Sequence, residues 1–183
     1  MECGGTMLAR FFSLLLLACA ANADIITFNF TGTVTQVPTD DVFGDISFQD
    51  AFSGSFTFDN SALDLVPSST TGSYSFSAPF GMNVQIDSHM FNATGNLNIS
   101  VLNSFVDQYT VLAESPDGLS LDMIFQDSTG AVFNSDALPL IEPALSAFDQ
   151  RDFHLVGEFD SGEVQIDGLI TSLGAASTPE PAA

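Results

Sequence analysis

Residues 26–35 have the sequence ITFNFTGTVT, in which apolar and polar residues alternate. One face of an extended chain would carry Ile26, Phe28, Phe30, Gly32 and Val34. The other face would carry Thr27, Asn29, Thr31, Thr33 and Thr35. Because successive side chains of a β-strand point to opposite faces, this period of two predicts a strand with one buried face.

The same alternation recurs along the chain and predicts further short strands at residues 52–58, 73–77, 82–86, 97–101, 108–113, 119–125, 153–159 and 164–170. Turn-forming residues separate these runs, and Asp160-Ser161-Gly162 predicts a hairpin between the last two. Residues 143–148, which begin with a proline, are the only helix candidate. Nine or ten strands at this spacing predict an all-β fold: an antiparallel β-sandwich, of which the jelly roll is one form.

The length of 183 residues suits one domain, which we assign to residues 24–173. Hydrophobic residues make up 45% of the chain and include 18 phenylalanines, which supply the core without polar atoms that need partners. Residues 174–183 follow as a linker that ends in Pro-Glu-Pro.

The N-terminus has the pattern of a signal peptide, residues 1–23. Arg10 precedes an apolar run at residues 11–20, which is shorter than the roughly 20 residues of a membrane span. Ala21 and Ala23 then form an A-x-A cleavage site. The sequence therefore predicts passage through the export machinery and an extracellular or cell-surface location. The alternative is a lipoprotein, because residues 16–19 (LLAC) resemble a bacterial lipobox in which Cys19 would be lipidated.

The net charge of −21 excludes several classes of partner. The chain has only two basic residues, Arg10 and Arg151, against 23 acidic ones. Nucleic-acid binding and polybasic membrane attachment both need a cluster of basic residues that this chain lacks. Cleavage after Ala23 would remove Arg10 and Glu2, so the mature domain would keep its charge with Arg151 as its only arginine or lysine. This excess predicts stabilisation by salt or divalent ions through relief of self-repulsion, and a melting temperature that is flat from low to moderate salt would contradict it.

The C-terminus carries the triplet Pro179, Glu180 and Pro181 after a short Gly/Ala/Ser linker. With the signal peptide and the Phe- and Thr-rich phrases at residues 30–35, 52–59 and 74–81, it resembles the PEP-CTERM family of exported bacterial proteins. In that family a transmembrane helix and a basic cluster follow the triplet; the printed sequence includes neither. The resemblance implies processing by an exosortase and a place in an extracellular polysaccharide matrix or surface layer.

No catalytic or cofactor-binding motif is recognisable. Neither histidine, His89 or His154, has a partner at metal-ligand spacing, and no G-x-S-x-G sequence occurs. We therefore expect a non-enzymatic protein, with a secreted hydrolase of unknown type as an alternative because serine and aspartate are abundant. A carbohydrate- or calcium-binding module is the other alternative, although sugar sites commonly use Trp or Tyr and this chain has no Trp and only Tyr74 and Tyr109.

Calcium is the cofactor that the acidic loops favour, since Ca²⁺ takes carboxylate and carbonyl oxygens, commonly from loops. The candidate ligands are Asp40, Asp41 and Asp45 in one loop, Asp59, Asn60 and Asp64 in a second, and Asp149 and Asp152 in a third. None has EF-hand spacing, and aspartate also favours turns in general, so solvated turn residues are the alternative.

Overall fold

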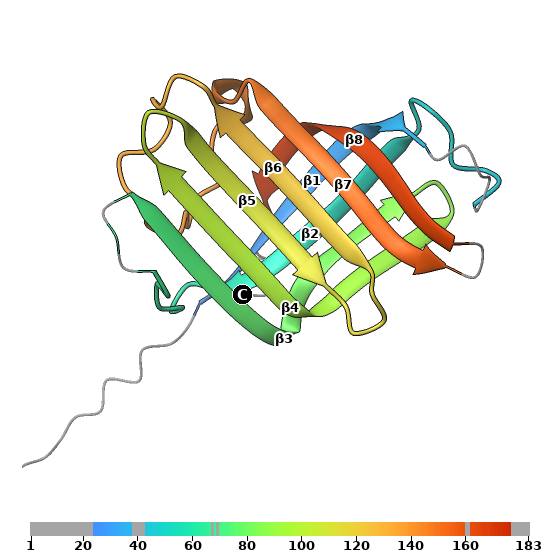
Figure 1. Ribbon diagram of the computed structural model, residues 1–183, viewed down its shortest axis with the longest axis horizontal. Coiled ribbons are helices and arrows are strands. Elements are labelled where there is room, and N and C mark those ends of the chain that lie inside the picture. The colour runs from blue at the N-terminus through green and yellow to red at the C-terminus, as the bar shows by residue number, and fades with distance from the viewer. Residues whose placement is uncertain (1–23, 38–42, 67, 69, 160–161, 177–183) are drawn as a thin grey trace, which may run out of the picture.

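The computed structural model describes residues 24–37, 43–66, 68, 70–159 and 162–176. Its eight strands form one closed antiparallel barrel in which each strand pairs with the next and the last pairs with the first (Figure 1). The strands are β1 (Ile25–Gln36), β2 (Ala51–Asp59), β3 (Thr71–Ile86), β4 (His89–Asn103), β5 (Asp107–Glu114), β6 (Ser120–Asp127), β7 (Gln150–Phe159) and β8 (Gly162–Ala175). A 3-10 helix, η1 (Leu145–Ala147), stands where residues 143–148 were predicted to be helical.

The predicted all-β antiparallel class is confirmed, but the predicted sandwich or jelly roll is wrong. Pairing of β1 with β8, for example Phe30 with Leu173, closes the sheet on itself. Alternation along each strand is the same in a sandwich and in a small barrel, so it does not distinguish them. The strand number also differs, because the runs at 73–77 and 82–86 are one strand, β3, with a register shift between Ser77 and Gly81.

Phenylalanine side chains fill the barrel interior, as the composition predicted. Phe28, Phe56 and Phe58 form a fully buried cluster, with ring centroids 5.4 to 6.0 Å apart. The ring of Phe52 lies against Gly32 and Gly168, where an added Cβ would overlap it. An eight-stranded barrel is just wide enough for side chains to fill, so these glycines make room for the ring.

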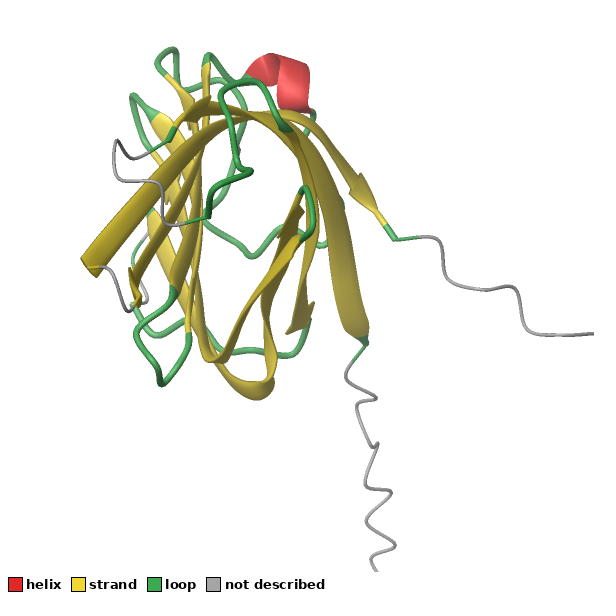
Figure 2. Cartoon of the chain, turned by 90° about the vertical axis from the view of Figure 1, so that its right-hand side faces the viewer, coloured by secondary structure: helices red, strands yellow, loops and turns green. Residues whose placement is uncertain are grey.

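The connections divide between two ends of the barrel. The described residues between β2 and β3 (60–66, 68 and 70), residues 104–106 and residues 128–149 lie at one end, which we call the capped end. The described residues of the β1–β2 connection (37 and 43–50), residues 87–88 and 115–119, and the paired ends of β7 and β8 lie at the other, which we call the cleft end. Figure 2 shows the ring of strands nearly end-on, with the short helix η1 above it. The pairing of Phe159 with Gly162 confirms the predicted β7–β8 hairpin, while residues 160–161 lie outside the described part.

The cap, residues 128–149, seals its end with apolar side chains and backbone hydrogen bonds. Phe148 is buried, and Phe133 packs against it and against Tyr109. The fully buried Asp107 carboxylate accepts the backbone N–H groups of Val132 at 2.8 Å and Phe133 at 2.7 Å through Oδ2. The core therefore continues into the cap at this end.

In the described ranges the sole helix is the three-residue η1, and no helix there has the length and apolar character to cross a membrane.

Candidate functional site

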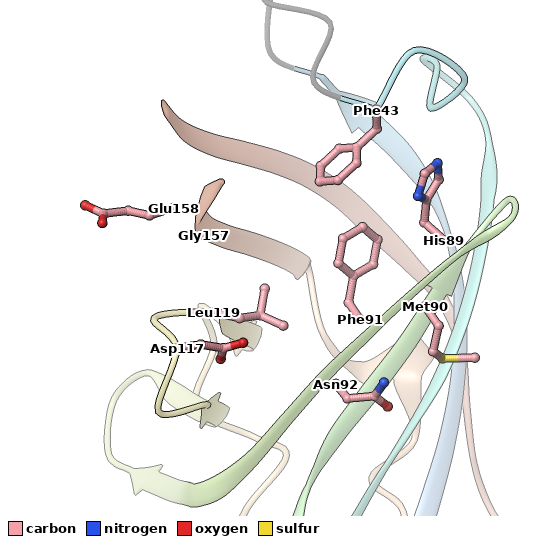
Figure 3. A pocket seen from close by; sticks show the side chains of 9 residues that line it. All are labelled: Phe43, His89, Met90, Phe91, Asn92, Asp117, Leu119, Gly157 and Glu158. Carbon is pink, nitrogen blue, oxygen red and sulfur yellow. The ribbon is translucent and has the colours of Figure 1, made fainter. Parts of the chain in front are cut away.

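A cleft of about 590 Å³ opens at the cleft end (Figure 3). Its walls come from β4, β7, the β5–β6 turn and the β1–β2 loop, and the residues that the argument uses are Phe43, His89, Phe91, Asp117, Leu119 and Gly157. The volume falls within the range of small-molecule pockets, roughly 300–1,000 Å³. We refer to it as the mouth cleft.

At the mouth cleft, the inward-facing side chains of the strands no longer fill the barrel interior. Phe91 continues the buried row of β4. On β7 the row runs Phe153, Leu155 and then Gly157, which has no side chain. The missing side chain leaves space beside Leu119, which lies just before β6 and is half-buried.

Two aromatic rings form the apolar wall of the mouth cleft. The ring centroids of Phe43 and Phe91 are 5.3 Å apart with an interplanar angle of 83°, an edge-to-face contact. In Figure 3 these rings point toward each other and Leu119 points into the same space, whereas the side chains of Met90 and Glu158 point away from it. The inner surface is thus aromatic and aliphatic, and polar groups stand around it.

The imidazole of His89 is held at the edge of the mouth cleft by a carboxylate. His89 Nε2 lies 2.6 Å from Asp45 Oδ1, and the hydroxyl of Ser88 donates to Asp45 Oδ2 at 3.1 Å. The hydrogen bond from His89 is the main cause that lowers the pKa of Asp45, so this carboxylate is ionised at neutral pH. The aspartate stands between the serine and the histidine, whereas serine hydrolysis requires the histidine to stand between the other two.

Asp117 supplies a second carboxylate at the rim. It lies in the exposed turn before β6, and the hydroxyl of Ser115 donates a hydrogen bond to its Oδ1. That bond lowers the pKa of Asp117. The described residues that line the mouth cleft thus include two acidic residues, Asp117 and Glu158, and no arginine or lysine.

The calcium candidates in the described ranges have separate local partners. Asp45 binds His89, Asp59 accepts the backbone N–H of Ser61, and Asp64 accepts those of Val66 and Ser73. In the same way Asn60 accepts the backbone N–H of Asp24, Asp149 accepts the hydroxyl of Ser128, and Asp152 accepts the amide of Gln150. No group of three or more His, Cys, Asp or Glu side chains in these ranges is arranged to hold a metal ion. The structure does not bring the loops together as one site.

Several predicted residues lie outside the described part of the chain: Asp40, Asp41, Cys19, Ala21, Ala23, Pro179, Glu180 and Pro181.

His154 points outward from β7, as its place in the alternation predicted. Its Nδ1 lies 2.8 Å from Asp167 Oδ1 on β8, and its cross-strand neighbour on β6 is Asp122. Burial raises the pKa of Asp122, and the nearby His154 opposes that shift. This row lies on the outer surface of the barrel and contributes nothing to the mouth cleft.

Sequence reasoning singled out His89 but none of the other residues of the mouth cleft. The sequence predicts Phe43 as a core residue, Asp117 as part of a turn and Leu119 as the start of a strand. The turn at 117–118 placed Asp117 at a strand end. Which strand ends meet follows from the closure of the barrel, which alternation does not reveal.

The fold and site together define the class: an up-and-down eight-stranded antiparallel barrel, with a cap at one end and an acidic, aromatic cleft at the other. Comparison with protein-family models, with curated proteins and with solved structures finds no significant match to this chain.

Proposed function

We propose that this chain is an exported, non-enzymatic binding protein of an extracellular polysaccharide matrix or surface layer, and that the mouth cleft is its binding site. The observation that carries the proposal is the aromatic corner of Phe43 and Phe91 at the cleft end. Aromatic rings beside hydrogen-bonding groups provide the apolar face and polar contacts that a sugar ring needs. The signal-peptide pattern and the terminal Pro-Glu-Pro support export and an association with exopolysaccharide.

Co-sedimentation of the purified barrel with extracellular polysaccharide tests this function. Phe43→Ala removes a ring of the mouth cleft from a loop and leaves the strands intact. Met90→Ala is the matched control, because Met90 lines the same end but is exposed and points away (Figure 3). We expect Phe43→Ala to release most of the retained protein and Met90→Ala to release none. If both variants and the wild-type protein are retained equally, the mouth cleft is not the polysaccharide-binding site.

Cell fractionation tests the export part of the proposal. A signal peptide that ends at Ala23 gives protein outside the membrane fraction, and Cys19→Ala then changes nothing. If Cys19 is lipidated, the protein is found with membranes and Cys19→Ala releases it. Retention of the full-length precursor in the cytoplasm would contradict export.

A secreted hydrolase is the second candidate, and the contact between His89 and Asp45 is the observation that favours it. An imidazole oriented by a carboxylate at the edge of a cleft can move a proton to or from a bound substrate. Hydrolysis of glycosides or esters that disappears in His89→Asn, with unchanged folding, would establish this candidate in place of the non-enzymatic one.

A further inference from the structure

We propose that the mouth cleft binds an amino sugar that carries a free ammonium group, with the sugar ring against Phe43 at the aromatic corner and the ammonium beside Asp117. This inference rests on the proposed function and specifies which class of polysaccharide the barrel recognises.

The charge of the molecule selects the charge of its partner. With a net charge of −21, the chain repels a polysaccharide of uronic or sulfated sugars and attracts a cationic one. Arg151 is the only arginine or lysine beyond residue 23, and it lies near the capped end of β7. Gly157 at the mouth cleft is six residues further along the strand, roughly 20 Å away at about 3.3 Å per residue.

The lining of the mouth cleft suits a ligand that has both an apolar ring face and an ammonium group, because it has aromatic side chains beside a carboxylate. Aromatic faces attract cations as well as the C–H groups of a sugar ring. The rings of Phe43 and Phe91 stand nearly perpendicular, and Phe91 is buried, so the half-buried ring of Phe43 offers most of the aromatic surface to a bound sugar. Figure 3 shows the carboxylate of Asp117 on the Leu119 side of the space, facing away from Glu158.

The turn that contains Asp117 also orients its carboxylate for binding an ammonium group. Ser115 donates to one carboxylate oxygen, which orients the group and keeps it ionised. An ammonium then gains a charge-assisted hydrogen bond, which is roughly twice as strong as a neutral one. A neutral N-acetyl group at the same place can also donate an N–H to the carboxylate, but it lacks the positive charge that adds Coulomb attraction.

Titration calorimetry with two tetrasaccharides tests the inference: tetra-glucosamine, with free amines, and tetra-N-acetylglucosamine, which is neutral. We expect the wild-type barrel to bind the amine form at least about tenfold more tightly at low salt. The preference should shrink as salt is raised. If tetra-N-acetylglucosamine binds equally well, the preference for an ammonium group is overturned, while the proposed polysaccharide-binding function still stands.

Two variants separate a specific contact from diffuse attraction. Asp117→Asn should weaken binding of tetra-glucosamine by about tenfold, the loss expected for one charge-assisted hydrogen bond. Glu158→Gln removes one charge from the same end, but its side chain points away, so we expect less than a twofold change. Equal losses in the two variants would overturn the site, because they would show that total charge alone attracts the sugar.

Phe43→Leu keeps an apolar side chain and removes the ring, so it should weaken binding of tetra-glucosamine further. Because Phe43 packs partly against the core, we expect only a small drop in melting temperature with it. If neither tetrasaccharide binds while the barrel still sediments with the extracellular polysaccharide, the amino-sugar inference fails and the proposed function survives. If sedimentation also fails, both are overturned.

Discussion

The two ends of the barrel use aspartate in opposite ways. At the capped end Asp107 and Asp127 are buried, and each accepts backbone N–H groups from the chain that closes the barrel. At the cleft end Asp45 and Asp117 are exposed. The side-chain partners of Asp45 are the His89 ring and the Ser88 hydroxyl, and that of Asp117 is the Ser115 hydroxyl. Both carboxylates are open to water, and the backbone N–H groups that help to lower the pKa of Asp117 belong to its own turn.

For Asp107 and Asp117 the difference follows from the length of the connection at their end of the barrel. The cap has residues to spare, so its backbone can turn back over Asp107 and present the N–H groups of Val132 and Phe133 to it. Asp127 accepts the N–H groups of Thr129 and Ala131 from the turn that directly follows it. Buried backbone donors must be paired, and a carboxylate pairs several at once. The turn at residues 115–119 is too short to enclose Asp117, which therefore stays available to a ligand.

Asp107→Asn should produce the largest loss of stability in this comparison. The substitution removes the charge from an acceptor of the N–H groups of Val132 and Phe133, with the side chain fully buried. We expect a loss of about 3 kcal/mol in the free energy of unfolding. At roughly 2–4 °C per kcal/mol for a chain of this size, thermal circular dichroism should show a melting temperature lower by about 6–12 °C. Asp87→Asn, an exposed turn position, is the matched control and should change nothing.

Tyr74→Phe should produce the next largest loss. The Tyr74 hydroxyl donates to the carbonyl oxygen of Asp136 and accepts the N–H of Leu138, both at 3.1 Å, and so ties β3 to the cap. Phenylalanine leaves both backbone groups without that partner, at a cost of about 1–2 kcal/mol. Hydrogen exchange should show faster exchange at Leu138 and unchanged protection in β5 and β6. An unchanged exchange rate at Leu138 would mean that the hydroxyl does not hold the cap.

The strands could be predicted from the sequence because alternation is a local property. Residues 26–35, 52–58 and 119–125 correspond closely to β1, β2 and β6. Closure could not be predicted, since it depends on β1 meeting β8 more than a hundred residues later in the sequence. The mouth cleft depends on that closure, because Phe43, Phe91 and Gly157 meet only when β4 and β7 belong to the same barrel.

The different roles of Asp107 and Asp117 could not be predicted from the sequence either. Asp107 and Asp117 both lie at or next to strand ends, and their neighbouring residues do not show which one is enclosed. The number of backbone donors within reach separates them, and that number is set by the fold of the cap.

The loss of stability at acidic pH provides a smaller test of the role of Asp127 at the capped end. Hydrogen bonds from the backbone N–H of Ala131 and from Thr129 lower the pKa of Asp127 below its usual value of 3.8. Its contribution is therefore complete above pH 3.8 and is lost as the pH falls through the lower folded-state pKa. The difference in melting temperature between wild type and Asp127→Asn should be largest near neutral pH and should vanish in strong acid. A difference that stays constant down to pH 2 would contradict the role of the ionised carboxylate.

Asp45→Asn should produce the smallest effect on stability, and it completes the comparison. The pKa of Asp45 is lowered chiefly by its hydrogen bond with His89, yet both side chains are partly open to water. Exposed ion pairs contribute little because solvent screens them and two side chains must be ordered to form them. We therefore expect an unchanged melting temperature but weaker binding of tetra-glucosamine, since Asp45 fixes His89 and the loop that carries Phe43 beside the mouth cleft. A large drop in melting temperature would show that this end is held together by its aspartates in the same way as the capped end. An unchanged melting temperature with reduced affinity would show that the carboxylates at the cleft end serve binding.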